Sequence, residues 1–415
     1  MNMLKIIENH LINIDMAFQE TPKNLTVMTY HMHGIRKCIS SNSNVNEFPE
    51  DVIFKSKAHK IVITCLDEKI NNNDIKLIQE TIWCLSNISL SSTPRIKELL
   101  ELQVVERVRP YLNMGTELIL ESAFWMLSNI LGECSSAKMP ILNSGYLDFI
   151  MTNIQTFLNS PKLSGVISWF SSNLLKANPK YDSKIARPYI KTLLPLLKNP
   201  LNSDIMVEMI WMFNYYLDVP NPDYYFINNL GIYGILKRVF KSNLMTTINP
   251  ILRIFGKLAL GDSSIIQNFL DQEFKAALLE KIKNSHPNIQ LDALWLLSNI
   301  ILTGTNECEF MSDSQVLELV RDLALDDSKT FPVRTQALVV LKNYFFQFGI
   351  TQREELIFKF GYVDCILFSF NFMNQELVET ALICLEDILK HGITVHHTKY
   401  NQYFFNFIDL SLIHI

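Results

Sequence analysis

An apolar pattern with helical spacing recurs along the chain at a period of 42 to 44 residues. Its clearest examples are the segments TIWCLSNIS, AFWMLSNIL and ISWFSSNLL, and turn signals such as SLSSTP and KANPK follow them. The tryptophans mark the period, because their successive spacings are 42, 44, 42 and 84 residues, the last being twice 42. The five positions are Trp83, Trp125, Trp169, Trp211 and Trp295.

The period continues where tryptophan is absent. Arg253 lies halfway between Trp211 and Trp295, and Val339 and Ile383 follow at intervals of 44 residues. Armadillo and HEAT repeats have periods of about 40–47 residues. A shorter helical stretch, a break that is often marked by glycine and a second apolar helix follow the long helix, which favours the three-helix armadillo plan over the two-helix HEAT plan. The glycines at these breaks are Gly145, Gly231 and Gly361.

We therefore predict an all-α fold, an armadillo-repeat right-handed superhelical solenoid of about nine three-helix repeats. The expected boundaries are an N-terminal segment 1–24, a solenoid over residues 25–395 and a C-terminal segment 396–415. No Gly-rich, Ser-rich or Pro-rich linker divides the chain, and one repeat cannot bury its own apolar faces. The sequence thus predicts one continuous stack without separate domains.

A second polar position recurs four residues after the marker position. The pairs are Trp83/Asn87, Trp125/Asn129, Trp169/Asn173 and Trp295/Asn299, and Asn343 follows Val339 at the same spacing. Residues four apart lie on one helical face, so stacking the repeats would align the pairs along the hollow side of the coil.

Such a ladder suits an extended basic peptide. An asparagine amide can bond a guest backbone N–H and C=O without reading its side chains. Neighbouring indoles would form slots for Lys or Arg stems, with cation–π attraction of roughly 0.5–2 kcal/mol each. A single tryptophan at helical spacing is more often a core residue, but four pairs in register favour a ligand-binding ladder.

These residues resemble importin-α (karyopherin-α), the family of adaptors that carry nuclear-localisation-signal cargo. The resemblance covers about residues 25–395 and includes two irregularities in the family's order. Trp211 is paired with Tyr215 in WMFNYYLDVPNPD, and Arg253 replaces a tryptophan in LRIFGKLALGDSS.

The resemblance implies two peptide-binding sites. Acids near the ladder, including Asp204, match the family by type, and Glu133 matches the acid that binds the most important cargo lysine. The implied major site comprises Trp83, Asn87, Trp125, Asn129, Glu133, Trp169, Asn173, Glu208, Trp211 and Asp218. The implied minor site comprises Arg253, Asp292, Trp295, Asn299 and Asn343.

Several positions depart from the family pattern. Ile96 stands where the family has a threonine beside the key lysine, and Ser91 replaces a nearby glycine. Lys257 replaces the sixth-repeat asparagine, and Val339 removes one minor-site indole. We therefore expect the major site to be better preserved than the minor site.

Composition and motifs exclude other classes. The formal net charge of −5 does not indicate a broad basic face for nucleic acid, and no apolar run approaches the ~18 residues of a membrane span. Seven dispersed cysteines without a CxxC pair are typical of reduced thiols in the cytoplasm or nucleus. No phosphate-loop, dinucleotide-binding, nucleophile-elbow or zinc-protease motif occurs, so we expect no enzyme, cofactor or metal site. The doublet His396–His397 is expected to lie in a surface loop.

The expected partners are Lys/Arg-rich cargo peptides, and the expected location is the cytoplasm and nucleus. The family begins with a basic arm that binds importin-β, whereas the first 24 residues here contain only Lys5 and Lys23 as basic residues. We therefore expect no direct high-affinity complex with importin-β. The alternative is an armadillo scaffold that binds another extended or helical partner without a transport role.

Overall fold

The computed structural model describes residues 3–40, 49–180, 182–242, 244–261, 263–284, 286–303, 311 and 313–395. Every regular element within these ranges is an α-helix or a 3-10 helix, which confirms the all-α armadillo solenoid. The described residues belong to two compact units, Met1–Asp223 and Tyr224–Ile415. The boundaries 25–395 of one continuous solenoid stay a prediction. The C-terminal segment 396–415, with its histidine doublet, lies outside the described residues.

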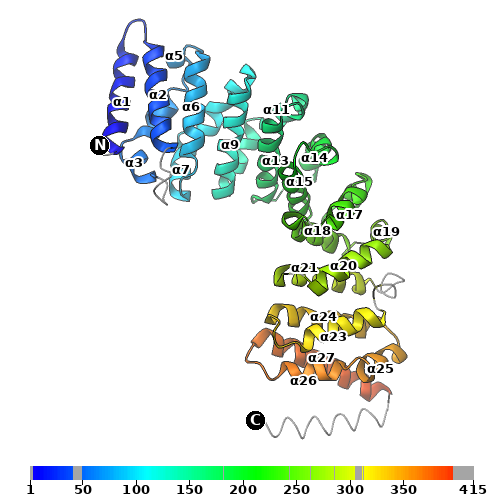
Figure 1. Cartoon of the computed structure of the whole chain (residues 1–415). Helices are drawn as coiled ribbons and strands as arrows, with labels where there is room; N and C mark the ends of the chain where they lie inside the picture. Colours follow the sequence, from blue (N-terminus) through cyan, green and yellow to red (C-terminus); the bar gives the residue numbers. More distant parts are fainter. Residues whose placement is uncertain are drawn as a thin grey trace. The chain divides into compact units, whose positions relative to one another are not determined.

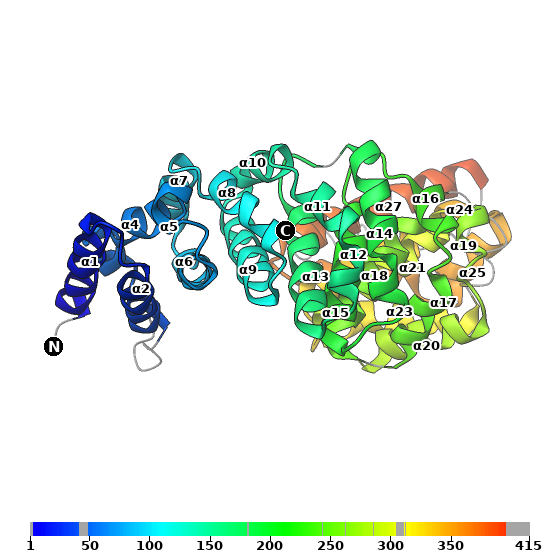
Figure 2. The same ribbon diagram turned by 90° about the horizontal axis from the view of Figure 1, so that it is seen from above.

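Unit 1 is built around a row of long helices, α2, α6, α9, α13 and α15, each packed against the next (Figure 1). Other helices connect them, and all of these except α14 are shorter, as the view from above also shows (Figure 2). The elements of unit 1 are α1 (Met3–Gln19), α2 (Leu25–Ser40), α3 (Glu50–Lys55), α4 (Ala58–Thr64), α5 (Glu68–Asn71), α6 (Ile75–Ile88), α7 (Thr93–Glu101), α8 (Val104–Val108), η1 (Arg109–Met114), α9 (Glu117–Glu133), η2 (Ser135–Ala137), α10 (Lys138–Asn143), α11 (Tyr146–Thr152), α12 (Ile154–Leu158), α13 (Pro161–Lys176), α14 (Ser183–Lys198) and α15 (Ser203–Tyr216).

Unit 2 continues the plan with a second row of long helices, α18, α21, α24 and α27, again each packed against the next (Figure 1). The elements of unit 2 are α16 (Tyr224–Asn229), α17 (Tyr233–Lys241), α18 (Met245–Leu258), α19 (Ser263–Ile266), α20 (Gln272–Asn284), α21 (Pro287–Leu302), α23 (Ser314–Leu325), α24 (Phe331–Gln347), α25 (Ile350–Phe358), α26 (Tyr362–Ser369) and α27 (Gln375–Val395).

The N-terminal segment is part of unit 1. Helix α1 packs on α2 and buries Ile7, Leu11 and Ile14 along one face. The apolar stripe at helical spacing explains this packing, because a helix with one apolar face gains stability by burying it. Most of the predicted segment 1–24 is therefore the first helix of the stack. No helix among the described residues combines the length and apolar character needed to cross a membrane.

In several repeats the junction between the two short helices has a left-handed backbone. Gly145, Gly231 and Gly361 have φ values of +73°, +66° and +64°, as the glycine breaks in the sequence suggest. Lys57 and Gln103 adopt the same conformation at the equivalent junctions before α4 and α8.

One repeat departs from the predicted three-helix plan. Between α13 and α15 the chain forms a single 16-residue helix, α14. Its sequence SKIARPYIKTLLPLLK contains no glycine to take up a left-handed turn, and none of its residues has positive φ. This repeat therefore has two helices, as a HEAT repeat does.

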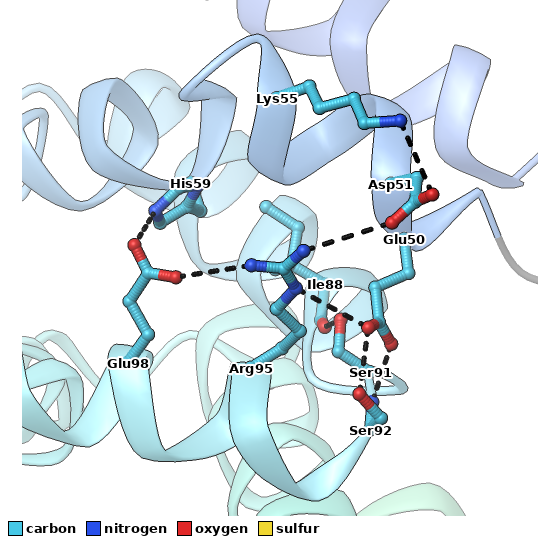
Figure 3. Close-up of polar contacts among 9 residues, drawn as sticks. All are labelled: Glu50, Asp51, Lys55, His59, Ile88, Ser91, Ser92, Arg95 and Glu98. Carbon is cyan, nitrogen blue, oxygen red and sulfur yellow. Dashed lines mark hydrogen bonds and ion pairs between the residues drawn. The ribbon is translucent and has the colours of Figure 1, made fainter.

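A polar cluster ties α3 and α4 of one repeat to α7 of the next (Figure 3). Arg95 on α7 forms ion pairs with Glu50 at 3.5 Å, Asp51 at 3.8 Å and Glu98 at 3.7 Å. Glu50 also accepts hydrogen bonds from the backbone N–H and the hydroxyl of Ser92, both 2.7 Å long, at the start of α7. The cluster thus caps α7 from the preceding repeat and satisfies a backbone donor that the helix itself cannot satisfy.

Gly145→Ala and Gly165→Ala should shift stability in opposite directions. Gly145 has φ +73°, so alanine there should destabilise the fold by about 1 kcal/mol. Gly165 lies inside α13 with open space at its Cβ position, so alanine there should stabilise by about 0.5–1 kcal/mol. Urea denaturation followed by far-UV circular dichroism measures both. Equal shifts of the same sign would contradict the assigned backbone conformations.

Candidate peptide-binding surface

The ladder positions of unit 1 lie on consecutive packed helices. Trp83, Trp125, Trp169 and Trp211 stand on α6, α9, α13 and α15, and none of the rings is fully buried. Trp125 is the most open, with 47% of its surface exposed. We call these four residues, together with the residue four positions after each, the unit-1 ladder surface.

Helix caps explain why the ladder positions stay in register. Asp74, Thr116, Ser160 and Asn202 each accept a hydrogen bond from the backbone N–H three residues later. In each of these helices the tryptophan follows the cap by nine residues. A fixed start plus a fixed helical rotation places every indole on the same side of its helix. These cap residues recur nine positions before each tryptophan in the sequence, and they could have been used to predict the start of each ladder helix.

The ladder asparagines make a recurring bond to the preceding repeat. In unit 1, Asn129 Nδ2 donates to the Ser86 carbonyl at 3.2 Å and Asn173 Nδ2 donates to the Ser128 carbonyl at 3.2 Å. Each acceptor is the residue three positions after the preceding tryptophan. Asn129 Nδ2 also donates to Ser89 Oγ at 3.0 Å. The ladder asparagine therefore joins neighbouring repeats, a role that the sequence did not reveal.

Unit 2 repeats the same bond. Asn299 Nδ2 donates to the Gly256 carbonyl at 3.0 Å, and Asn343 Nδ2 donates to the Ser298 carbonyl at 3.3 Å. Asn299 is only 5% exposed, so its amide is mainly a contact within the stack. In both units the bond uses the Nδ2 group of the asparagine. The Oδ1 atom of the same side chain takes no part in it.

One pair of neighbouring indoles, Trp125 and Trp169, leaves no slot of the predicted kind between its rings. Trp125 and Trp169 contact each other edge to face, with ring centroids 5.1 Å apart and planes at 64°. A methylene stem between two ring faces needs roughly 7 Å, twice an ordinary carbon–carbon contact. The gap between these two rings is therefore closed in this structure. Trp211 instead stacks on Tyr215, with centroids 5.5 Å apart and planes at 24°.

The acids of the implied major site have contacts within the protein. Glu133 is exposed and accepts a hydrogen bond from the Thr93 hydroxyl. The sequence pattern did not indicate Thr93, and Ile96, at the position of the family's threonine, is fully buried. Asp218 forms an ion pair with Lys180 at 3.4 Å.

Glu208 stands one turn before Trp211 and is partly buried. Burial raises the pKa of its carboxyl above the ordinary glutamate value, although a hydrogen bond from the Ser172 hydroxyl acts in the opposite direction. Nearby Asp204 raises the pKa further, because two negative charges repel. A cation brought to this position would relieve both effects.

In unit 2, the implied minor-site acid is already paired. Arg253 Nε lies 3.0 Å from Asp292 Oδ2, and Asn249 Nδ2 donates to the same oxygen at 2.7 Å. The indole of Trp295 lies directly over Gly256, where an added Cβ would come within 2.2 Å of the ring. The structure thus brings Arg253, on α18, close to Asp292 and Trp295, on α21. The carboxylate of Asp292 forms its ion pair with Arg253.

Comparison with known proteins bears on the fold and on the family resemblance. No family model matches the chain. Importin subunit alpha-1b of Oryza sativa subsp. japonica is 23% identical over 217 residues, covering 52% of this chain and 40% of the relative. Importin subunit alpha-9 of Arabidopsis thaliana is 22% identical over 318 residues, covering 73% and 58%. The chain is therefore similar to importin alpha subunits, at low identity.

The chain spans about two fifths to three fifths of the length of these curated relatives. Among solved structures, an engineered protein superposes with a TM-score of 0.67 at 16% identity, covering 93% of this chain and 99% of the other. That likeness concerns the fold alone.

Gly256→Ala should displace the Trp295 indole from its position on α21 in unit 2. The added methyl group has no room, so we expect a shifted tryptophan emission and a loss of about 1–3 kcal/mol in stability. Gly234→Ala is the control, because no atom lies within 4 Å of its Cβ position. Fluorescence and urea denaturation measure the two effects. An unchanged emission spectrum for Gly256→Ala would refute the close contact.

Proposed function

We propose that this chain is a binding adaptor that holds basic nuclear-localisation-signal peptides in an extended conformation for nuclear protein import. The observation that carries the proposal is the unit-1 ladder surface, where partly exposed indoles recur on consecutive helices with asparagine or tyrosine one turn later. Core packing alone does not require a row of large rings to remain open to solvent.

The chemistry of the surface fits a basic guest. The Oδ1 atoms of Asn129 and Asn173 can accept N–H groups of a guest backbone, since the bonds to the preceding repeat use only the amide nitrogen. The outer face of Trp125 can carry a Lys or Arg stem. Glu133 and Glu208 provide carboxylates for charge-assisted hydrogen bonds at two levels of the ladder.

The relatives support the transport part of the proposal, because their names identify them as importin alpha subunits. By this proposal the chain acts in the cytoplasm and nucleus. Partnership with importin-β is not part of the proposal.

A second candidate is an armadillo scaffold that binds another extended partner. The contacts within the protein favour it: Trp125 closes on Trp169, and Asp218 and Asp292 are engaged by Lys180 and Arg253. Such a scaffold would show no preference for lysine-rich peptides, which separates the two candidates by experiment.

A lysine-rich peptide of about eight residues should quench the tryptophan emission of the full chain and bind more weakly as salt rises. Trp125→Ala should weaken binding about tenfold, because it removes a cation–π platform worth roughly 0.5–2 kcal/mol and its contact with Trp169. Tyr30→Ala is a matched control, since Tyr30 on α2 is 69% exposed and lies outside the ladder. Equal affinity for a peptide with glutamine in place of lysine would favour the scaffold.

Peptide affinity should fall as the pH is lowered from 7 to about 5. The pKa of Glu208 is raised in the free protein, whereas a bound cation favours the ionised carboxylate, so binding releases a proton. Glu208→Gln should therefore weaken binding at neutral pH and flatten the decline. Isothermal titration calorimetry at several pH values measures both. An unchanged pH profile in Glu208→Gln would remove Glu208 from the site.

A further inference from the structure

The first indole of the ladder is covered by a cation of the chain itself. The guanidinium carbon of Arg36, on α2, lies 3.7 Å from the centroid of the Trp83 ring. This distance is ordinary van der Waals contact, so no other group fits between them. Arg36 is only 8% exposed, although its position on α2 is next to the ladder helix α6.

Two neighbours hold Arg36 in this place. Its Nε donates to Glu80 Oε2 at 2.7 Å, and its Nη2 lies 2.8 Å from His33 Nδ1. Glu80 precedes Trp83 by three residues on α6 and therefore shares its helical face. A charge-assisted bond from the same helix that carries the indole fixes the guanidinium over the ring.

We call each indole, together with the residue four positions later, a rung; the asparagine of the first rung, Asn87, is half-buried. The amide nitrogen of Asn87 is buried and makes no hydrogen bond to any described residue. In contrast, the amide nitrogens of Asn129 and Asn173 donate to the preceding helix. The ring face of Trp83 that Arg36 covers is thus closed to a guest cation.

We propose that Arg36 occupies the first cation position of the ladder and so determines where a guest peptide begins. The inference rests on the proposed function. A guest engages the rungs of Trp125, Trp169 and Trp211, and a further lysine beyond the Trp125 end finds the Trp83 face taken. Arg36 therefore limits the number of consecutive guest cations that the unit-1 ladder surface binds.

Alanine substitutions of the two indoles test this directly in the full chain. With a fluorescently labelled peptide of eight lysines, Trp125→Ala should weaken binding about tenfold and Trp83→Ala less than about twofold. Equal losses for the two variants would mean that Arg36 moves aside for the guest, and would overturn the inference while leaving the proposed function intact. Absence of binding by the wild-type chain would overturn the proposed function and the inference with it.

Removal of Arg36 should open the covered rung. Arg36→Ala should bind the eight-lysine peptide about fivefold more tightly, and the gain should disappear for a four-lysine peptide too short to reach Trp83. Arg36→Lys, which keeps a cation over the ring, should show no gain. It also keeps the test decisive if the alanine variant is unstable by circular dichroism.

Arg95→Ala is the matched control for the change in charge. Arg95 also pairs with carboxylates and lies 4.8 Å from the Phe54 ring, but it stands on α7 in the cluster of Figure 3. A gain of the same size in Arg95→Ala would assign the effect to net charge and overturn the inference. A gain confined to Arg36→Ala would support it.

Discussion

The hydrogen bond from a ladder asparagine to the carbonyl of the preceding long helix is the interaction on which the stack and its surface both depend. It occurs at Asn129, Asn173, Asn299 and Asn343, always to the residue three positions after the previous marker. Each bond satisfies a buried or half-buried amide and joins two repeats. The same side chain keeps its carbonyl oxygen for another partner. One residue type thus fixes the spacing of the helices and lines the surface between their indoles, which explains why asparagine recurs despite its poor helix propensity.

Periodicity was enough to predict the fold because each repeat encodes its own apolar faces. The tryptophan spacing gives the repeat length, and the glycines at 145, 231 and 361 mark the left-handed junctions. The prediction was wrong for the repeat containing α14, where the chain forms one continuous helix and no residue adopts the left-handed conformation. It also left residues 3–19 outside the stack, since a single helix without the marker motif does not show the period although its apolar face is buried.

The candidate site was harder to predict than the fold, because its decisive contacts join residues about 35–50 positions apart on different helices. Nothing local indicates that Arg36 lies over Trp83, that Thr93 bonds Glu133, or that Trp125 and Trp169 touch. Likewise, Asp292 was a candidate for a guest cation, but Arg253 from the neighbouring repeat already neutralises it. The pattern identified the ladder positions, whereas stacking determines which of them remain open.

The most direct test of the account is the response of the indole N–H signals in a ¹H–¹⁵N spectrum of the full chain as an eight-lysine peptide is added. The five tryptophans give one indole signal each, assignable by single phenylalanine substitutions. A basic peptide lying along the unit-1 ladder surface shifts the signals of Trp125, Trp169 and Trp211 together, with one common saturation curve. Signals that stay unmoved at saturating peptide, or a change confined to Trp295, would contradict the account.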